Sequence, residues 1–154
     1  MALPDNPLIN AFRYGLEYLG IGHWIAPFPI RREAGPWRRR DIAIPAGYVI
    51  RPPDFVGVGT QKSGTSWWAS LVEQHPGVAP NRFGRKEMHY LSHFLERSLT
   101  KDDIETYHAA FARPDGKLCG EWTPNYMPNP QSIVRLKEAA PNARLLVMLR
   151  NPVD

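Results

Sequence analysis

The residues with the clearest chemical character form one short stretch, Lys62-Ser63-Gly64-Thr65-Ser66, which is preceded by Gly59. Gly59 and Gly64 allow the backbone to turn tightly and to approach an anion closely. The first amides of a helix that follows such a turn have no intrahelical acceptor and can bind an anion. Lys62 adds a positive charge, and the hydroxyl groups add hydrogen-bond donors. The stretch therefore predicts a phosphate-binding loop.

The kind of phosphate loop is narrowed by the position of its lysine. An ATPase or GTPase loop reads G-x-x-x-x-G-K-(S/T). Gly59 and Gly64 keep that spacing, but Thr65 follows the second glycine and the lysine lies inside the loop at Lys62. An ATPase-type loop is therefore disfavoured, although a nucleotide-dependent phosphotransferase stays as an alternative. A connecting turn with no ligand is a second alternative, which the lysine and the hydroxyl groups disfavour.

A second group of reactive side chains follows at Lys86, Glu87 and His89. It places a carboxylate, an imidazole and a cation within four residues, which suits proton transfer. If the chain is extended there, Glu87 and His89 lie on the same side. The segment is therefore a candidate for the end of a catalytic strand. Such a charged group is also typical of a solvated surface, and the residues alone leave both possibilities open.

The loop is expected to join a buried strand to a helix. Phe55 to Val58 is a short apolar run with β-branched residues, which is typical of a buried strand. Residues 66–74 follow with a helical pattern that His75-Pro76-Gly77 ends. The residues of this helix that we expect to face the sheet are Trp67, Trp68, Leu71 and Val72.

A second helix and strand are expected near the end of the sequence. Residues 130–140 predict a helix, and residues 143–149 form a continuous apolar run, typical of a parallel strand buried on both faces. Strand, helix and strand in this order predict an α/β fold with a parallel sheet flanked by helices. Three further elements are expected: a strand near Tyr48-Val49-Ile50, a helix over 100–112 that begins with Thr100 and Asp103, and a strand with a turn over 117–126.

Residues 1–53 are expected to form an N-terminal helix and a connector that wraps the domain. Apolar residues at spacings of three and four predict an amphipathic helix within residues 6–26. Residues 27–53 are rich in proline, arginine and glycine and predict irregular structure. The domain itself is expected to span residues 54–154.

Composition and charge exclude several classes of protein. The 154 residues are 43% hydrophobic and 22% charged, which is typical of one globular domain. The net charge of +4 suits an anionic ligand. Five arginines lie within residues 31–40, but no nucleic-acid-binding motif accompanies them, so nucleic acid is not an expected partner.

Cysteine content and hydropathy exclude further kinds of site and segment. The single cysteine, Cys119, excludes an intramolecular disulfide and a cysteine-based zinc site, and we expect it to be buried. The sequence has no apolar run of about 18 residues, so no membrane span is expected. The N-terminus does not resemble a signal peptide. We therefore expect a cytoplasmic location.

The loop resembles the 5′-phosphosulfate loop of the sulfotransferases, P-K-(S/T)-G-T-(S/T)-x-(L/W), with Gln61 in place of the proline. These enzymes use 3′-phosphoadenosine 5′-phosphosulfate as donor. The resemblance implies that the donor binds to Gln61, Lys62, Ser63, Gly64, Thr65, Ser66 and Trp67. Arg150 is similar to the first arginine of a later family motif, R-(D/N)-P-x-(D/E)-R-x-x-S, which holds the 3′-phosphate.

Two further segments resemble the carbohydrate, or heparan-type, sulfotransferases. Lys86 to Tyr90 is similar to K-E-x-H-(F/Y), and this implies that Glu87 is the general base and His89 its partner at the acceptor. Lys62 is implied to act on the sulfuryl group. Residues 120–126 resemble G-E-(K/T)-(S/T)-P-x-Y, a segment beside the active site, but Trp122 stands where relatives often have a lysine.

The resemblance implies a sulfotransferase that transfers a sulfuryl group from 3′-phosphoadenosine 5′-phosphosulfate to a hydroxyl or amine of a glycan, lipid or small-molecule acceptor, with no metal. It implies a three-layer α/β/α domain that continues beyond Asp154. A truncated nucleotide-binding domain without catalysis is a further alternative to the phosphotransferase. The sequence identifies neither the acceptor nor the oligomeric state.

Overall fold

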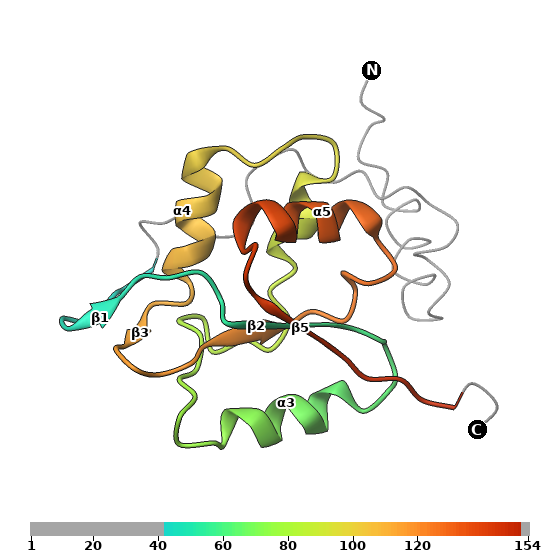
Figure 1. Cartoon of the computed structure of the whole chain (residues 1–154), viewed down its shortest axis with the longest axis horizontal. Coiled ribbons are helices and arrows are strands. Elements are labelled where there is room, and N and C mark those ends of the chain that lie inside the picture. Colours follow the sequence, from blue (N-terminus) through green and yellow to red (C-terminus); the bar gives the residue numbers. More distant parts are fainter. Residues whose placement is uncertain (1–41, 152–154) are drawn as a thin grey trace, which may run out of the picture. The chain divides into compact units, whose positions relative to one another are not determined.

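The computed structural model describes residues 42–151, so the helix expected over residues 6–26 and most of the expected connector lie outside the described residues. The described elements follow one another along the chain as in Figure 1. They are β1 (Tyr48–Val49), β2 (Phe55–Gly59), α3 (Thr65–Glu73), the 3-10 helix η2 (Tyr90–Phe94), α4 (Lys101–Ala109), β3 (Arg113–Pro114), β4 (Gly120–Trp122), α5 (Pro130–Ala139) and β5 (Arg144–Val147). The strands and helices predicted within this range are confirmed, with ends that differ by a few residues, except for the strand considered at Glu87.

The central sheet is parallel and has the strand order β4-β2-β5. In its register Val56 pairs with Glu121 on one side and with Leu145 on the other. All five residues of β2 are buried. The remaining described strands, β1 and β3, form a separate antiparallel pair. The predicted parallel sheet, with the loop directly after its central strand, is confirmed.

Helices cover both faces of this sheet. In Figure 1, α3 lies on one side of the sheet, and α4 and α5 lie on the other. The larger part of the core lies between the sheet and the pair of helices α4 and α5, and Cys119 is buried there as expected. Its largest members are Tyr90, Leu91, Phe94, Tyr107, Phe111, Tyr126 and Leu136. The fold is therefore an α/β sheet with flanking helices.

The predicted buried face of α3 is wrong for three of its four residues, whereas Val72 is partly buried and packs against the cluster of Phe55, Ala69 and Trp122. Trp67 is 66% exposed, and Trp68 and Leu71 are also exposed, whereas the buried residues of α3 are Thr65 and Ala69. The reason lies in β4, because the ring of Trp122 fills the space between the sheet and α3. A Cβ atom on Gly57 would lie 2.0 Å from Cε3 of that ring. Little room is left under the helix for large side chains.

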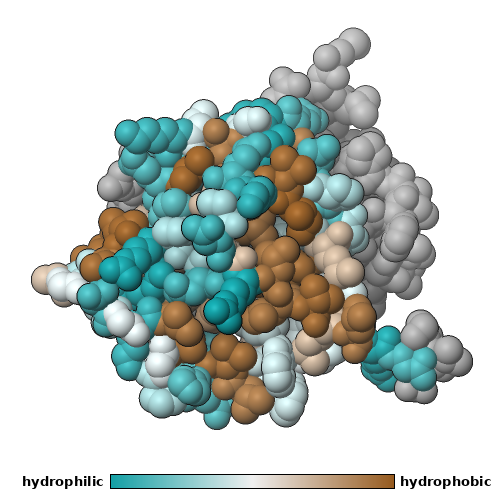
Figure 2. Space-filling model, in the orientation of Figure 1, coloured by the Kyte–Doolittle hydropathy of each residue, from teal (hydrophilic) through white to brown (hydrophobic). Residues whose placement is uncertain are grey.

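The prediction that the strand at 143–149 is buried on both faces is also wrong. β5 pairs with β2 along one edge, and no described strand pairs with its other edge. Leu145 is 50% exposed, Val147 46% and Leu149 75%. Figure 2 shows hydrophobic side chains gathered on the face where Figure 1 places β5. An apolar composition indicates that a strand is suited to burial, but its place at the edge of the described sheet decides its exposure.

Side-chain caps explain where the two helices of the larger core layer begin. The Thr100 hydroxyl accepts from the Asp103 amide, and the Asp103 carboxylate accepts from the Thr100 amide, which is a complete capping box. Asn129 caps α5, and Pro130 occupies its first turn. His108, on α4, lies 2.7 Å from the Ala139 carbonyl oxygen through its Nε2 and so joins the two helices.

Candidate active site

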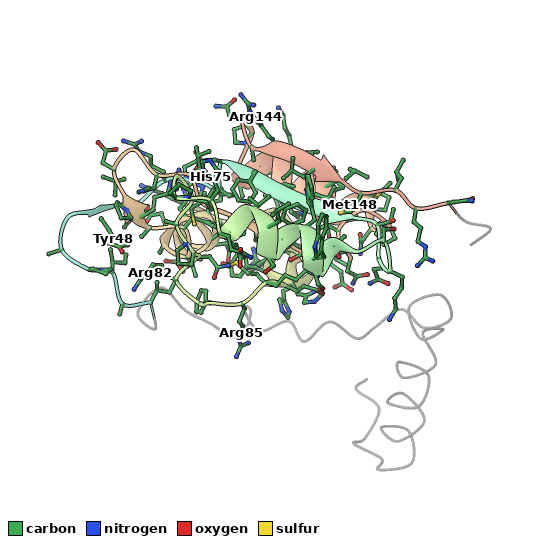
Figure 3. The ribbon with its side chains drawn as sticks, turned by 90° about the horizontal axis from the view of Figure 1, so that it is seen from below. Tyr48, His75, Arg82, Arg85, Arg144 and Met148 are labelled. Atoms are coloured by element: carbon green, nitrogen blue, oxygen red, sulfur yellow. The ribbon has the colours of Figure 1, made fainter. Side chains whose placement is uncertain are left out.

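The loop after β2 is held in place by the residue that follows β5. The Thr60 amide and the Thr60 hydroxyl both donate to the Met148 carbonyl oxygen at 2.9 Å. The Met148 amide in turn donates to the Gly59 carbonyl oxygen at 2.8 Å. Figure 3 labels Met148 at the far end of β5 from Arg144. The loop therefore starts from a fixed point at the carboxyl end of the sheet, where ligands of α/β proteins commonly bind.

The loop itself leaves its hydrogen-bond donors available. Lys62 and Gly64 have positive φ angles, 61° and 79°, and Gly64 is the residue directly before α3. Among the residues that the structure describes, no acceptor bonds the amides of residues 62–66, and no carboxylate pairs with Lys62. Uncompensated amides at a helix N-terminus beside a lysine form an anion-binding site.

One ammonium group connects the first turn of α3 to the second group of reactive side chains. Lys86 Nζ donates to Thr65 Oγ1 at 3.2 Å, to Ser66 Oγ at 2.9 Å and to Glu87 Oε1 at 3.0 Å. The Lys86 carbonyl oxygen accepts from the Trp122 amide at 3.1 Å, so its backbone is fixed to β4. The structure thus brings the loop and Glu87 together, as the sequence motifs require.

Sequence reasoning assigned Lys86 no role of its own. Its position in the motif beside Glu87 was a signal, but nothing in the sequence showed that it reaches the hydroxyl groups of α3. Ser66 and Lys86 are 20 residues apart in the sequence, and only the folded chain brings their side chains into contact.

Glu87 and His89 are in contact, but the expected strand end is not formed. Residues 85–89 are irregular, and His89 has a positive φ of 52° directly before η2. This turn brings His89 Nε2 to 3.3 Å from Glu87 Oε2. The Glu87 side chain remains 39% exposed, so a substrate can reach it.

The neighbours of Glu87 hold its pKa low. The hydrogen bond from His89 has the largest effect, and Lys86 acts in the same direction. Partial burial opposes them, but the net result is a pKa of about 2 instead of the ordinary 4.5. Glu87 is therefore an ionised carboxylate throughout the neutral range.

The remaining residues of the predicted site lie around the loop. Gln61 Nε2 donates to Asn125 Oδ1 at 3.3 Å, and the Thr60 and Ser63 hydroxyls are in a short hydrogen bond. Trp67 projects from α3, with its ring centroid 5.9 Å from that of Trp68. Arg150 is exposed and lies two residues after Met148, on the segment that holds the loop.

Trp122 does not take the place of the lysine that relatives often carry. Its side chain is 1% exposed and packs under α3, with its ring centroid 6.4 Å from that of Phe55. Within residues 42–151, no group of three or more His, Cys, Asp or Glu residues could hold a metal ion.

Comparison with known proteins gave related sequences and a related structure. No family model matches the chain. It is 33% identical over 112 residues to the membrane-associated sulfotransferase kil1 of Dictyostelium discoideum, covering 70% of this chain and 22% of that protein. It is 30% identical over 121 residues to the human heparan sulfate glucosamine 3-O-sulfotransferase 6, covering 78% of this chain and 30% of that protein.

A crystal structure of a sulfotransferase from Alicyclobacillus acidocaldarius has a similar fold. The TM-score is 0.55 and the identity 30%, over 68% of this chain and 47% of that one. The chain thus spans less than a third of the length of the two curated relatives and about half of the solved protein.

Proposed function

We propose that this chain, which belongs to a sulfotransferase family, provides two parts of an active site. These are the donor loop and the general base for transfer of a sulfuryl group from 3′-phosphoadenosine 5′-phosphosulfate. The observation that carries the proposal is the hydrogen bonding of Lys86. Its ammonium joins Ser66, in the first turn after the loop, to Glu87. An anion site and a carboxylate base held in contact are what this reaction needs.

The donor fits the groups that the loop offers. Within residues 42–151 the amides of residues 62–66 have no acceptor and Lys62 has no carboxylate partner, and together with the surrounding hydroxyl groups they suit the 5′-phosphosulfate. The exposed ring of Trp67 and the amide side chain of Gln61 border this loop, and Arg150 supplies a cation for the 3′-phosphate. We propose that all the loop residues from 61 to 67 contact the donor.

The reaction breaks the bond between sulfur and the bridging oxygen of the phosphosulfate and forms a bond between sulfur and an acceptor oxygen or nitrogen. The acceptor gives its proton to Glu87. The electron pair of the broken bond stays on the 5′-phosphate of the leaving bisphosphate. Lys62 and the loop amides stabilise the negative charge that develops there, and the imidazole of His89 keeps Glu87 oriented.

The low pKa of Glu87 determines when the proton moves. A carboxylate with a pKa of about 2 is a weak proton acceptor. The proton of the acceptor becomes more acidic as its oxygen or nitrogen bonds to sulfur, so we place the proton transfer late in the same step. An acceptor that displaces His89 also makes Glu87 a stronger base, because the His89 contact is the largest cause of the low pKa.

The acceptor we propose is a hydroxyl or amine of a carbohydrate. This rests on relatives that are named for heparan sulfate. They include the human 3-O-sulfotransferase and a bifunctional N-deacetylase/N-sulfotransferase of Caenorhabditis briggsae, which is 27% identical over 102 residues. Because Trp122 is buried, position 122 offers an acceptor neither a cation nor an exposed ring.

The described helices include none that is long and apolar enough to cross a bilayer. The cytoplasmic location stays a prediction, and the relative kil1 is named as membrane-associated. Cell fractionation of the full chain, with and without a salt wash, separates a cytoplasmic protein from one bound to a membrane surface.

The test of the proposed function is calorimetric titration with 3′-phosphoadenosine 5′-phosphate, in parallel with ATP and Mg²⁺. We expect the bisphosphate to bind preferentially, and Lys62→Ala to weaken it by about tenfold or more, as loss of a charge-assisted contact does. Lys101→Ala is the matched control, because Lys101 is 91% exposed on α4, across the sheet from α3. A preference for ATP would indicate a phosphotransferase and overturn the proposal.

A further inference from the structure

A buried carboxylate that the proposed reaction does not use lies beneath the segment that carries the base. Glu121 is in the middle of β4 and is 1% exposed. Successive residues of a strand point to opposite faces, so Glu121 points away from Trp122 and into the layer of α4. It accepts hydrogen bonds from Tyr107 at 2.6 Å, from Thr123 at 2.6 Å and from Tyr126 at 3.4 Å.

Two of these three hydroxyl groups also reach the Glu87 segment, which we define as residues 86–91. Thr123 Oγ1 accepts from the Met88 amide at 3.1 Å and from the His89 amide at 3.4 Å. The Tyr126 hydroxyl accepts from the Leu91 amide at 3.2 Å. The backbone on both sides of the His89 turn is therefore bonded to hydroxyl groups that Glu121 holds.

The direction of each bond follows from the chemistry of a hydroxyl group. A threonine hydroxyl has one hydrogen to donate and two lone pairs to accept with. Thr123 gives its hydrogen to Glu121, so both lone pairs remain for the amides of Met88 and His89. Burial raises the pKa of Glu121, while the hydrogen bonds from Thr123, Tyr107 and Tyr126 act in the opposite direction and favour the carboxylate. As a carboxylate Glu121 only accepts, and so it fixes this direction.

We propose that Glu121 is a positioning residue, which acts through Thr123 and Tyr126 to hold Glu87 and His89 in the geometry required for proton transfer. The inference rests on the proposed function, in which Glu87 is the general base. It adds a role for a buried residue that contacts neither donor nor acceptor.

A purely structural role for Glu121 predicts a different result from a positioning role. If Glu121 only filled and bonded the core, its loss would lower stability. Removing its negative charge would then leave the pKa of Glu87 unchanged or lower it slightly. If Glu121 positions the segment, its loss loosens the contacts of Glu87 with His89 and Lys86, and the pKa of Glu87 rises. The two roles therefore move this pKa in opposite directions.

The variants follow from the hydrogen-bond directions. Glu121→Met has nearly the same volume but accepts no hydrogen bond, so the hydroxyl groups of Thr123 and Tyr126 lose the acceptor that fixes their direction. Thr123→Val keeps the side-chain volume and removes the bridging hydroxyl, and Thr123→Ser restores it. Tyr107→Phe is the matched control, because Tyr107 bonds the same carboxylate but no amide of the Glu87 segment.

The experiment is a carbon-13 NMR titration of the Glu87 carboxyl group in the full chain. We expect its pKa to move from about 2 toward 4.5 in Glu121→Met and Thr123→Val. It should stay low in Thr123→Ser and Tyr107→Phe. Hydrogen exchange of the Met88 and His89 amides in the unaltered chain gives a second readout, which needs no variant to fold, and we expect slow exchange at both.

A Glu87 pKa that stays at about 2 or falls in folded Glu121→Met or Thr123→Val overturns the positioning role. Rapid exchange of both amides in the unaltered chain does the same. Neither readout needs a ligand, so the result is independent of donor binding. An unaltered chain that binds no bisphosphate would overturn the proposed function and leave the titration interpretable.

Discussion

Lys86 Nζ lies 2.9 Å from Ser66 Oγ and 3.0 Å from Glu87 Oε1. A single ammonium group therefore bonds both the first turn of α3 and the side chain proposed as the base. This arrangement keeps the base close to the loop through direct hydrogen bonds between side chains. The pKa of Glu87 therefore depends on Lys86 and His89, and single substitutions can separate the effects of these two residues.

Replacement of the two neighbours of Glu87 should raise its pKa to different extents. His89→Ala removes the largest cause of the low pKa, and Lys86→Met removes a smaller one while retaining the apolar stem. We expect the larger rise in His89→Ala. Carbon-13 NMR titration of the Glu87 carboxyl measures both shifts, and a pKa that stays at about 2 in His89→Ala would contradict the assigned contact.

The stability that Glu87 contributes should depend on pH in a defined window. Its pKa is about 2 in the folded chain and 4.5 ordinarily, so the unfolded chain binds more protons between these values. The contribution is therefore complete above about pH 4.5 and is lost as the pH falls toward 2. Urea denaturation of the unaltered chain and of Glu87→Gln at several pH values tests this. Two curves that stay parallel across the window would show that the low pKa is absent.

Two arginines near β3 should differ strongly in their effect on stability. Arg113 is buried, and its guanidinium pairs with Asp54 at 2.8 Å and donates to the carbonyl oxygens of Phe111 and Pro52. Arg113→Ala removes the cation beside Asp54 and a donor from both carbonyl oxygens, and it should cost about 3–5 kcal/mol.

The matched control for Arg113 is Arg51→Ala. The ion pair of Arg51 with Asp115 is exposed on both sides, so its loss should cost less than about 1 kcal/mol. Thermal and urea unfolding measure both variants. Equal losses of stability in Arg113→Ala and Arg51→Ala would show that the buried guanidinium does not stabilise the strands around it.

Introduction of the family's lysine at position 122 should unfold the chain instead of improving acceptor binding. Trp122→Lys places a charge against Gly57 under α3 and removes a buried ring, which should cost at least about 3 kcal/mol. Trp122→Phe retains an apolar ring and should cost less. Circular dichroism melts compare the two, and a stable Trp122→Lys chain would show that this side chain can turn out of the core.

The sequence was sufficient for the elements and for the residues of the loop. The apolar run at β2, the glycines of the loop and the cap at Thr100 are local signals, so they could be read directly. The contact between Glu87 and His89 was also anticipated, although a turn with a positive φ forms it, and not a strand.

The sequence was insufficient to predict the exposure and contacts of side chains that depend on packing between distant segments. The exposure of Trp67 follows from the ring of Trp122, which lies 55 positions further on and takes the space under α3. The exposure of Leu145 follows from the place of β5 at the edge of the described sheet. The bonds of Glu121 to Tyr107 and Thr123 likewise need the whole fold.

The burial of Cys119 gives the chain an internal reporter of opening motions. Burial raises the pKa of its thiol to about 12, and its amide is bonded to Asp54 Oδ2 at 2.8 Å, directly before β4. Since it is the only cysteine in the sequence, an alkylating reagent can label the chain at no other thiol. The rate of that labelling then measures how often the edge of the sheet beside Glu121 separates from the core, with no mutation or attached probe.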